Sequence, residues 1–237
     1  MSWISRLLRR KTPAPHAPVL SGRRDVDARP HMDFAEFTPE LGQFLGQAAY
    51  VQIVIFEGIA RAVLAAASVA DKEALVKASA AAVRKQRKLV KLIRSTGLEP
   101  AEVMSPFAPA IDAFNDSTVG HDWWELLVSS YVTAGMLDEF FVGLAVGLPK
   151  PYSSQVSAIL EVPGATEVLA GLLHSGIEQD PVLADRLALW ARRLVGDTLL
   201  VARSALEGAS TIDEVEPVFT ELIAGHSRRM DALGLTA

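Results

Sequence analysis

The stretch SAAAVRKQRKLVKLIRSTG, residues 79–97, decides the fold class of this chain. Val83, Gln86, Leu89 and Ile93 recur at steps of three and four residues, which places them on one face of a helix. Six Lys and Arg residues are interspersed among them. The pattern predicts an amphipathic helix that turns this face, with Gln86 as its polar member, toward a core.

A second stretch has one polar residue on an otherwise apolar face. Residues 39–67 repeat apolar side chains at helical spacing, and Gln52 alone interrupts the stripe. Thr38 and Pro39 are typical of an N-cap followed by the first helical residue. We therefore expect a long helix with Gln52 inside the protein.

The rest of the chain is also predicted to be helical, because no stretch alternates with a period of two. Asp71, Asp122 and Asp180 stand where N-caps are expected, and Pro163-Gly164 should kink or split the fourth helix. The further helices are expected over 71–95, 122–147, 152–177, 180–207 and 211–233. We predict an all-α protein, an antiparallel four-helix bundle with two additional C-terminal helices.

Composition narrows the kinds of chemistry available to the chain. It has 237 residues and no cysteine, which excludes disulfides and thiolate metal sites. Its longest uncharged run, Leu41 to Phe56, looks too short and too polar to span a membrane, so we expect a cytoplasmic protein. Residues 1–30 hold seven basic and two acidic residues, which gives this segment a net charge of +5. The other residues together carry a net charge of −10, so the whole chain has a net charge of −5.

The first eleven residues, MSWISRLLRRK, resemble a short basic amphipathic segment. Such a segment suits the anionic inner face of a membrane or a partner protein, although a frayed terminus is the more ordinary interpretation. Residues 12–37 resemble a linker, and residues 38–237 form the helical domain. The predicted contact residues are Trp3, Ile4, Arg6, Leu7, Leu8, Arg9, Arg10 and Lys11.

Signatures of a carboxylate-bridged metal centre are missing. Such a centre in a helical bundle needs Glu-x-x-His pairs, and none of the five histidines has an acidic residue three positions before it. The basic face 84–94 could bind nucleic acid or an acidic partner, but a solvated helix face is commoner. The aromatic residues from Trp123 to Phe141 could line a ligand pocket, although core packing is the more usual role.

Several stretches resemble a known family. They are LADRLALWARRLVGD (183–197), HSRRMDALGL (226–235), DWWELLVSSYVTAGMLDEFF (122–141) and MSPFAPAIDAF (104–114). The chain resembles the actinobacterial ferritin-like proteins described as similar to the MiaE tRNA hydroxylases. The resemblance covers roughly residues 38–237 and implies a ferritin-like bundle.

The resemblance also implies that the di-iron ligands of this family are lost here. Glutamine replaces a glutamate on the first helix, and both ligands of a Glu-Ile-Gly-His stretch are replaced on the second. The third helix keeps one acidic residue near the expected place, and the fourth carries aliphatic residues. The former metal-site positions implied in this way are Gln52, Val83, Gln86, Ala134, Glu139, Val162 and Ala165.

The leading functional hypothesis is a metal-free bundle without a cofactor that acts as a binding or scaffolding module. In it, the two inward glutamines hydrogen-bond each other or Glu139, which would be buried without a cation. One alternative is a di-iron hydroxylase or other oxidoreductase of the MiaE-like type. Another is a binder of an apolar small molecule in the bundle core. The predicted partner is an unknown protein or a second copy of the chain.

Overall fold

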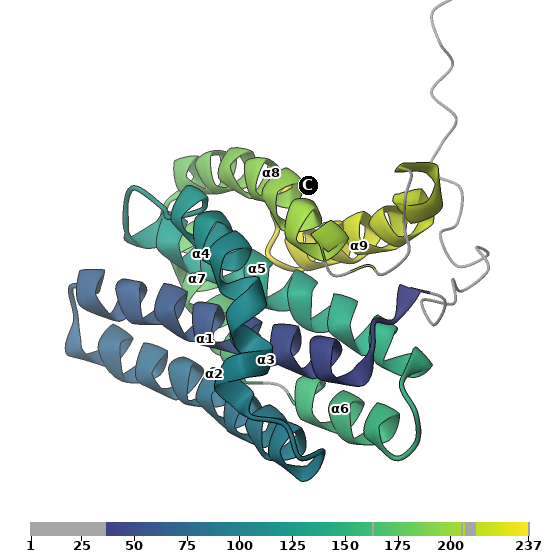
Figure 1. The fold of residues 1–237 in the computed structure, drawn as a ribbon. Helices are drawn as coiled ribbons and strands as arrows, with labels where there is room; N and C mark the ends of the chain where they lie inside the picture. The colour runs from purple at the N-terminus through teal and green to yellow at the C-terminus, as the bar shows by residue number, and fades with distance from the viewer. Residues whose placement is uncertain (1–36, 163, 205, 207–211, 237) are drawn as a thin grey trace, which may run out of the picture. The chain divides into compact units, whose positions relative to one another are not determined.

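A computed structural model describes residues 37–162, 164–204, 206 and 212–236 (Figure 1). They belong to the compact unit Met32–Ala237. The predicted contact segment 1–11 and nearly all of the predicted linker 12–37 lie outside the described residues.

Every regular element among the described residues is a helix. The helices follow one another with short connections, as predicted for an all-α protein. Their bounds are α1 Leu41–Ala65, α2 Val69–Ser95, α3 Pro100–Met104, η4 Ser105–Phe107, α4 Ala108–Ser117, α5 Trp123–Leu144, η5 Ala145–Gly147, α6 Tyr152–Leu160, α7 Ala165–Gln179, α8 Pro181–Ser204 and α9 Ile212–Ala232.

Four helices form the central bundle. α1 packs against α2 and α5, and α7 packs against the same two helices, so the four make a closed square (Figure 1). Each contributes fully buried apolar side chains, such as Phe44, Leu89, Phe140 and Leu169. Burying this surface supplies most of the free energy that holds such a bundle together.

The two C-terminal helices cover one side of this bundle. α8 contacts α4, α5 and α7, and α9 contacts α5 and α8 (Figure 1). The predicted fourth helix is split into α6 and α7, where Gly164 adopts a φ of +147°. The sequence predictions of a four-helix bundle, a broken fourth helix and two additional helices are confirmed.

Two of the predicted helix starts are wrong, one by two residues and the other by three. Glu40, not Thr38, is the N-cap of α1, because the Thr38 hydroxyl instead donates to the carbonyl oxygen of Leu144 at 2.6 Å. Ser68, not Asp71, is the N-cap of α2, and its Oγ accepts from the Asp71 N–H at 3.0 Å. In both cases the residue predicted as the N-cap lies close to the true N-cap but makes a different hydrogen bond.

Gly46 allows α3 to approach α1 closely. A Cβ atom on Gly46 would overlap the backbone carbonyl of Val103, which has no rotamer that could relieve the clash. We predict that Gly46→Ala lowers the free energy of unfolding by about 1–3 kcal/mol. Gly171→Ala on α7 is the matched control, since nothing lies within 4 Å of its Cβ position, and it should be neutral or stabilising. Urea denaturation measures both, and equal midpoints would contradict the close approach.

Three stretches of the described residues have the length and hydropathy of a membrane span. They are Leu41–Ala65, Trp123–Gly147 and Tyr152–Gln179. The sequence expectation that the stretch beginning at Leu41 is too short and too polar to span a membrane is therefore wrong by this criterion. In the bundle, the first two stretches contribute Gln52 and Asp138, which contact each other. The third stretch is divided between α6 and α7.

Candidate functional site

Three polar side chains meet between α1, α2 and α5. The Nζ of Lys85 lies 2.6 Å from Oδ2 of Asp138, and the Nε2 of Gln52 donates to the Oδ1 of the same carboxylate at 2.7 Å. Gln52 is 2% exposed and Lys85 is 8% exposed. Both oxygens of one carboxylate thus have a donor, and one ammonium group balances its charge.

Burial and hydrogen bonding act in opposite directions on this carboxylate. Loss of solvation raises the pKa of Asp138 above its ordinary value. The charge and hydrogen bond of Lys85 oppose this rise, followed by the Gln52 hydrogen bond and the charge of Arg229. The net pKa remains raised, so Asp138 depends on the neighbouring ammonium to keep its charge inside the bundle.

The predicted inward face of α2 is correct at Leu89 and Ile93, which are buried, but wrong at Gln86, whose neighbour Lys85 is the polar residue that faces the core. Leu75, Ala82, Lys85 and Leu89 lie on the buried face, whereas Gln86 is only partly buried. A lysine can occupy this face because its long aliphatic stem packs in the interior while its amine reaches a carboxylate. The sequence signal for the buried position of Lys85 is a helical stripe of small and apolar residues that includes this lysine.

Glu139 does not lie in the interior without a cation. Its carboxylate pairs with Arg229 and lies 3.4 Å from Nη2 of Arg228, and its side chain is 35% exposed. The neighbouring Asp138 is the acidic residue that bonds to Gln52. The predicted bond from a glutamine to Glu139 is therefore wrong. Periodicity could not choose between the two acids, because α5 has buried residues on all of its faces.

The other implied metal-site positions are aliphatic residues in different settings. Ala134 and Ala165 are buried, Val83 is partly buried, and Val162 is exposed. Val162 lines the same cleft as Lys85 and Asp138. That these positions once held metal ligands stays a prediction.

A cleft of about 360 Å³ opens beside the ion pair. Lys85 and Asp138 line it with Tyr131, Gly135 and Arg229, and α6, α7 and their connection complete the wall. The Nε and Nη2 atoms of Arg229 are buried and have no hydrogen-bond partner among the described residues. The cleft is therefore lined by the Lys85–Asp138 pair, by Arg229 and by two further carboxylates, Glu161 and Glu167.

The residues at the ion pair do not fit a di-iron centre. A metal ion bound to Asp138 would lie beside the ammonium of Lys85, which repels it, and Gln52 is a weak neutral ligand. In the part of the chain that the structure describes, no group of three or more His, Cys, Asp or Glu residues could hold a metal ion. The arrangement can support an internal ion pair and can bind polar groups in the cleft.

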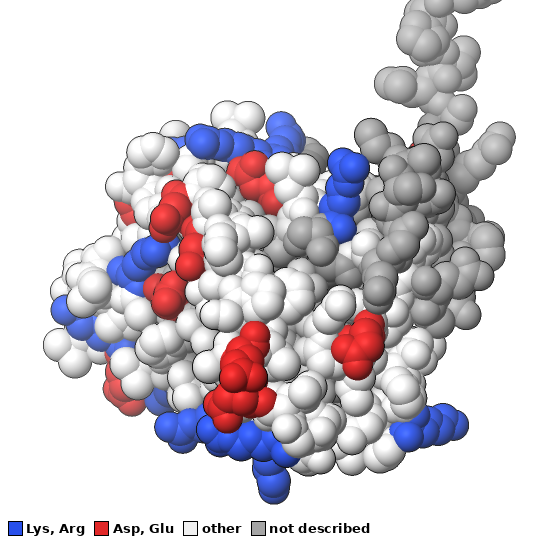
Figure 2. Space-filling view, viewed as in Figure 1, with Lys and Arg blue, Asp and Glu red and all other residues white. Residues whose placement is uncertain are grey.

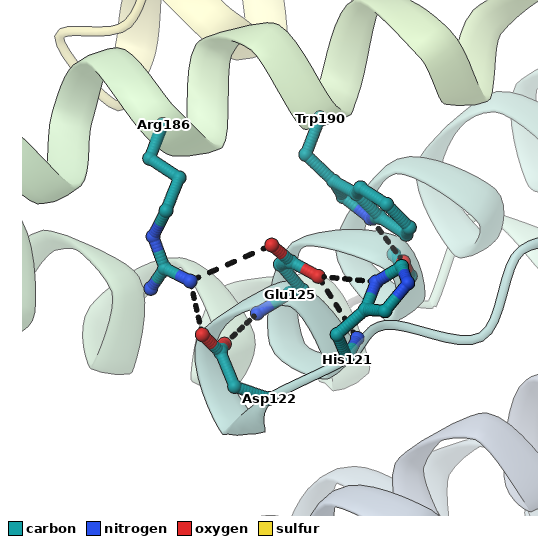
Figure 3. Close-up of polar contacts among 6 residues, drawn as sticks. His121, Asp122, Glu125, Arg186 and Trp190 are labelled. Carbon is teal, nitrogen blue, oxygen red and sulfur yellow. Dashed lines mark hydrogen bonds and ion pairs between the residues drawn. The ribbon is translucent and has the colours of Figure 1, made fainter.

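A second polar cluster joins the start of α5 to α8 (Figure 3). The Glu125 carboxylate accepts from the backbone N–H of His121 at 2.8 Å and lies 3.0 Å from its Nδ1. Arg186 pairs with Asp122, the N-cap of α5, and lies 3.5 Å from Glu125. The Nε1 of Trp190 donates to Ser129 at 2.8 Å. The cluster caps α5 and fixes α8 against it, which is a structural role.

Most of the aromatic residues on α5 pack in the core. Phe140 and Phe141 are fully buried, and the ring of Phe141 packs edge-on against Phe44 with centroids 5.5 Å apart. Tyr131 is the member of this row that lines the cleft, and its hydroxyl donates to the carbonyl of Arg229 at 3.2 Å. The row thus supports the bundle more than it forms an apolar pocket.

Comparison with known proteins identifies the fold family. No curated protein was found to be similar to the chain. Residues 35–213 match the family model described as a ferritin-like domain of actinomycetes. The match covers most of the chain and includes all three residues of the buried ion-pair site. The chain therefore belongs to this ferritin-like family.

Proposed function

We propose that this protein is a metal-free ferritin-like bundle that acts as a binding or scaffolding module rather than as a redox enzyme. The supporting observation is the contact of 2.6 Å between Lys85 and Asp138, together with the hydrogen bond from Gln52. In this proposal the ammonium supplies, within the bundle, the positive charge that a metal would supply. Redox chemistry on iron needs open coordination positions and several carboxylate or imidazole ligands, and neither is available around this ion pair.

The proposal treats the loss of ligands as complete. Gln52, Lys85 and Ala82 face the interior from α1 and α2, and Ala134 and Ala165 do so from α5 and α7. None of these side chains is a carboxylate or an imidazole. What remains is a helical frame, a charged cleft and an exposed surface, which suits a protein that holds a partner.

Iron content tests this function. We expect protein purified from iron-supplemented cells to contain far less than one iron atom per chain by elemental analysis, because the ammonium of Lys85 repels metal ions at Asp138. A ferritin-like protein with intact ligands, prepared in parallel, shows that the purification retains iron. Iron close to two atoms per chain would favour the di-iron hydroxylase instead.

A second candidate function follows from the cleft. Its lining holds Asp138, Glu161 and Glu167 together with Lys85 and Arg229, which favours a small polar molecule over the apolar ligand expected from the sequence. The volume of about 360 Å³ is within the range of ligand sites. Native mass spectrometry of the same preparation tests it: a co-purified small molecule that is absent from an Arg229→Leu variant would favour ligand binding over scaffolding.

A further inference from the structure

The C-terminal half of α2 carries an unusual concentration of positive charge. Residues 84–94 contain six basic residues and no acidic residue, within a body that is acidic as a whole. Lys85 points inward, and the other five are exposed. In Figure 2 basic side chains gather along the lower edge of the molecule, where Figure 1 places this part of α2. We call these five residues the basic row: Arg84, Arg87, Lys88, Lys91 and Arg94.

The side chains of the basic row have no ion pair or hydrogen bond with any described residue. At about 100° per residue they share an arc of roughly 120° on the helix. Neighbours three or four residues apart, such as Arg84 with Lys88 and Arg87 with Lys91, therefore repel one another. Attraction to the helix dipole explains only Arg94, which lies in the last turn. The basic row is thus an arrangement that an anionic partner would stabilise.

An apolar groove runs beside the basic row. It lies between α2 and α6 and has a volume of about 520 Å³. Leu92, Ala158 and Ile159 form its apolar part, and Lys88 and Lys91 line the α2 side. The helix on the other side, α6, contains no charged residue. The groove therefore combines an apolar surface with positive charge along one side.

We infer that this groove is the docking site for an acidic amphipathic helix of a partner protein. An apolar ridge on such a helix fills the groove, and its acidic residues, repeated every three or four positions, pair with the basic row. This inference rests on the proposed binding function and names its class of partner.

Other anionic partners fit the observations less well. A nucleic-acid backbone pairs with Lys and Arg but offers no apolar ridge to fill the groove, and residues 84–94 contain no aromatic side chain on which bases could stack. A lipid surface binds apolar side chains that protrude, whereas the apolar residues here line a groove. Charge and shape together favour the acidic helix.

Fluorescence anisotropy with a labelled peptide tests the inference. The probe is a peptide of about 18 residues, long enough to be helical, with leucines on one face and glutamates on the other. We expect saturable binding to the full chain that weakens with salt, and at least tenfold weaker binding to the double variant Lys88→Glu/Lys91→Glu. The matched control, Lys72→Glu/Lys150→Glu, makes the same charge change at exposed sites outside the groove and should bind like the unmodified protein.

Four results would overturn the inference. One is the absence of saturable peptide binding, and another is equal loss of binding in both double variants. The third is equal or tighter binding of a Leu→Ser version of the peptide, of a nucleic-acid duplex or of anionic vesicles. A dimer in sedimentation that Lys88→Glu/Lys91→Glu dissociates would assign the groove to a second copy instead. Iron content is measured on the same samples to distinguish this inference from the proposed metal-free function. Iron in a protein that still binds the peptide would refute only the metal-free function.

Discussion

Replacing Lys85 by Met is expected to lower the free energy of unfolding by about 3–5 kcal/mol, the cost of leaving one member of a buried ion pair alone. The side chains of Lys85 and Asp138 are only 10% and 16% exposed, so water cannot solvate the remaining carboxylate well. Gln52 still donates to it but carries no charge. Urea denaturation at neutral pH measures the loss.

A double variant separates the charge from the packing. In Lys85→Met/Asp138→Asn both charges are removed and the amide can still bond to Gln52, so stability should return to within about 1 kcal/mol of the original protein. Lys77→Met is the matched surface control, because Lys77 pairs with Glu73 in an exposed position, and it should cost no more than about 0.5 kcal/mol. A loss in Lys85→Met as small as that in Lys77→Met would show that Lys85 is not paired inside the bundle.

Acid should weaken this protein through a single buried histidine. His226 on α9 is 3% exposed, and neither of its ring nitrogens has a hydrogen-bond partner among the described residues. Burial lowers the pKa of His226 to about 4, and the charge of Arg229 adds to the effect. The unfolded chain, with a pKa near 6.5, therefore binds more protons than the folded chain between these values.

The sign of the pH effect follows directly. The favourable contribution of neutral His226 is complete above pH 6.5, and about 3 kcal/mol of it is lost as the pH falls from 6.5 toward 4. We expect His226→Leu to remove this part of the pH dependence and to be at least as stable as the original protein at pH 7. The control is His174→Gln, which changes an exposed histidine. Parallel stability curves for the original protein and His226→Leu from pH 7 to 4 would contradict the buried neutral state.

The fold could be predicted from the sequence because its signals are local. Repeats of apolar residues every three or four positions marked the long helices, and the Pro163-Gly164 pair marked the break between α6 and α7. The first residues of the helices are predicted less accurately. Thr38 satisfied the rules for an N-cap, but its hydroxyl reaches the end of α5, more than a hundred residues away. A contact at that sequence distance leaves no local signal.

The candidate site could be predicted only in part, because it depends on helix rotation. Gln52 was correctly placed inside, since it interrupts an otherwise apolar stripe. The sequence pattern predicts Lys85 on the solvent face, because lysine rarely enters a core without a partner. Its partner, Asp138, lies on a helix that is buried on all sides, where the apolar pattern does not show which way a residue points. The pair becomes visible only when α2 and α5 are placed together.

The cleft and the groove beside the basic row are further consequences of how the helices pack, whereas the basic charge of residues 84–94 can be read from the sequence. Arg229 comes from α9 and reaches the cleft past Gly135, where a Cβ atom would overlap its side chain. The groove beside the basic row exists because α6 breaks away from α7 and packs against α2. Neither the cleft nor the groove has a short sequence motif. The proposals for the cleft and the groove therefore depend on the geometry and charge of the folded protein.

Anomalous X-ray diffraction at the iron edge, on crystals of protein from iron-supplemented cells, tests the central claim most directly. The account predicts continuous density from the Lys85 amine to the Asp138 carboxylate at hydrogen-bond distance, with no anomalous peak between α1, α2, α5 and α7. One or two strong anomalous peaks at that place, with Lys85 turned away from Asp138, would contradict it.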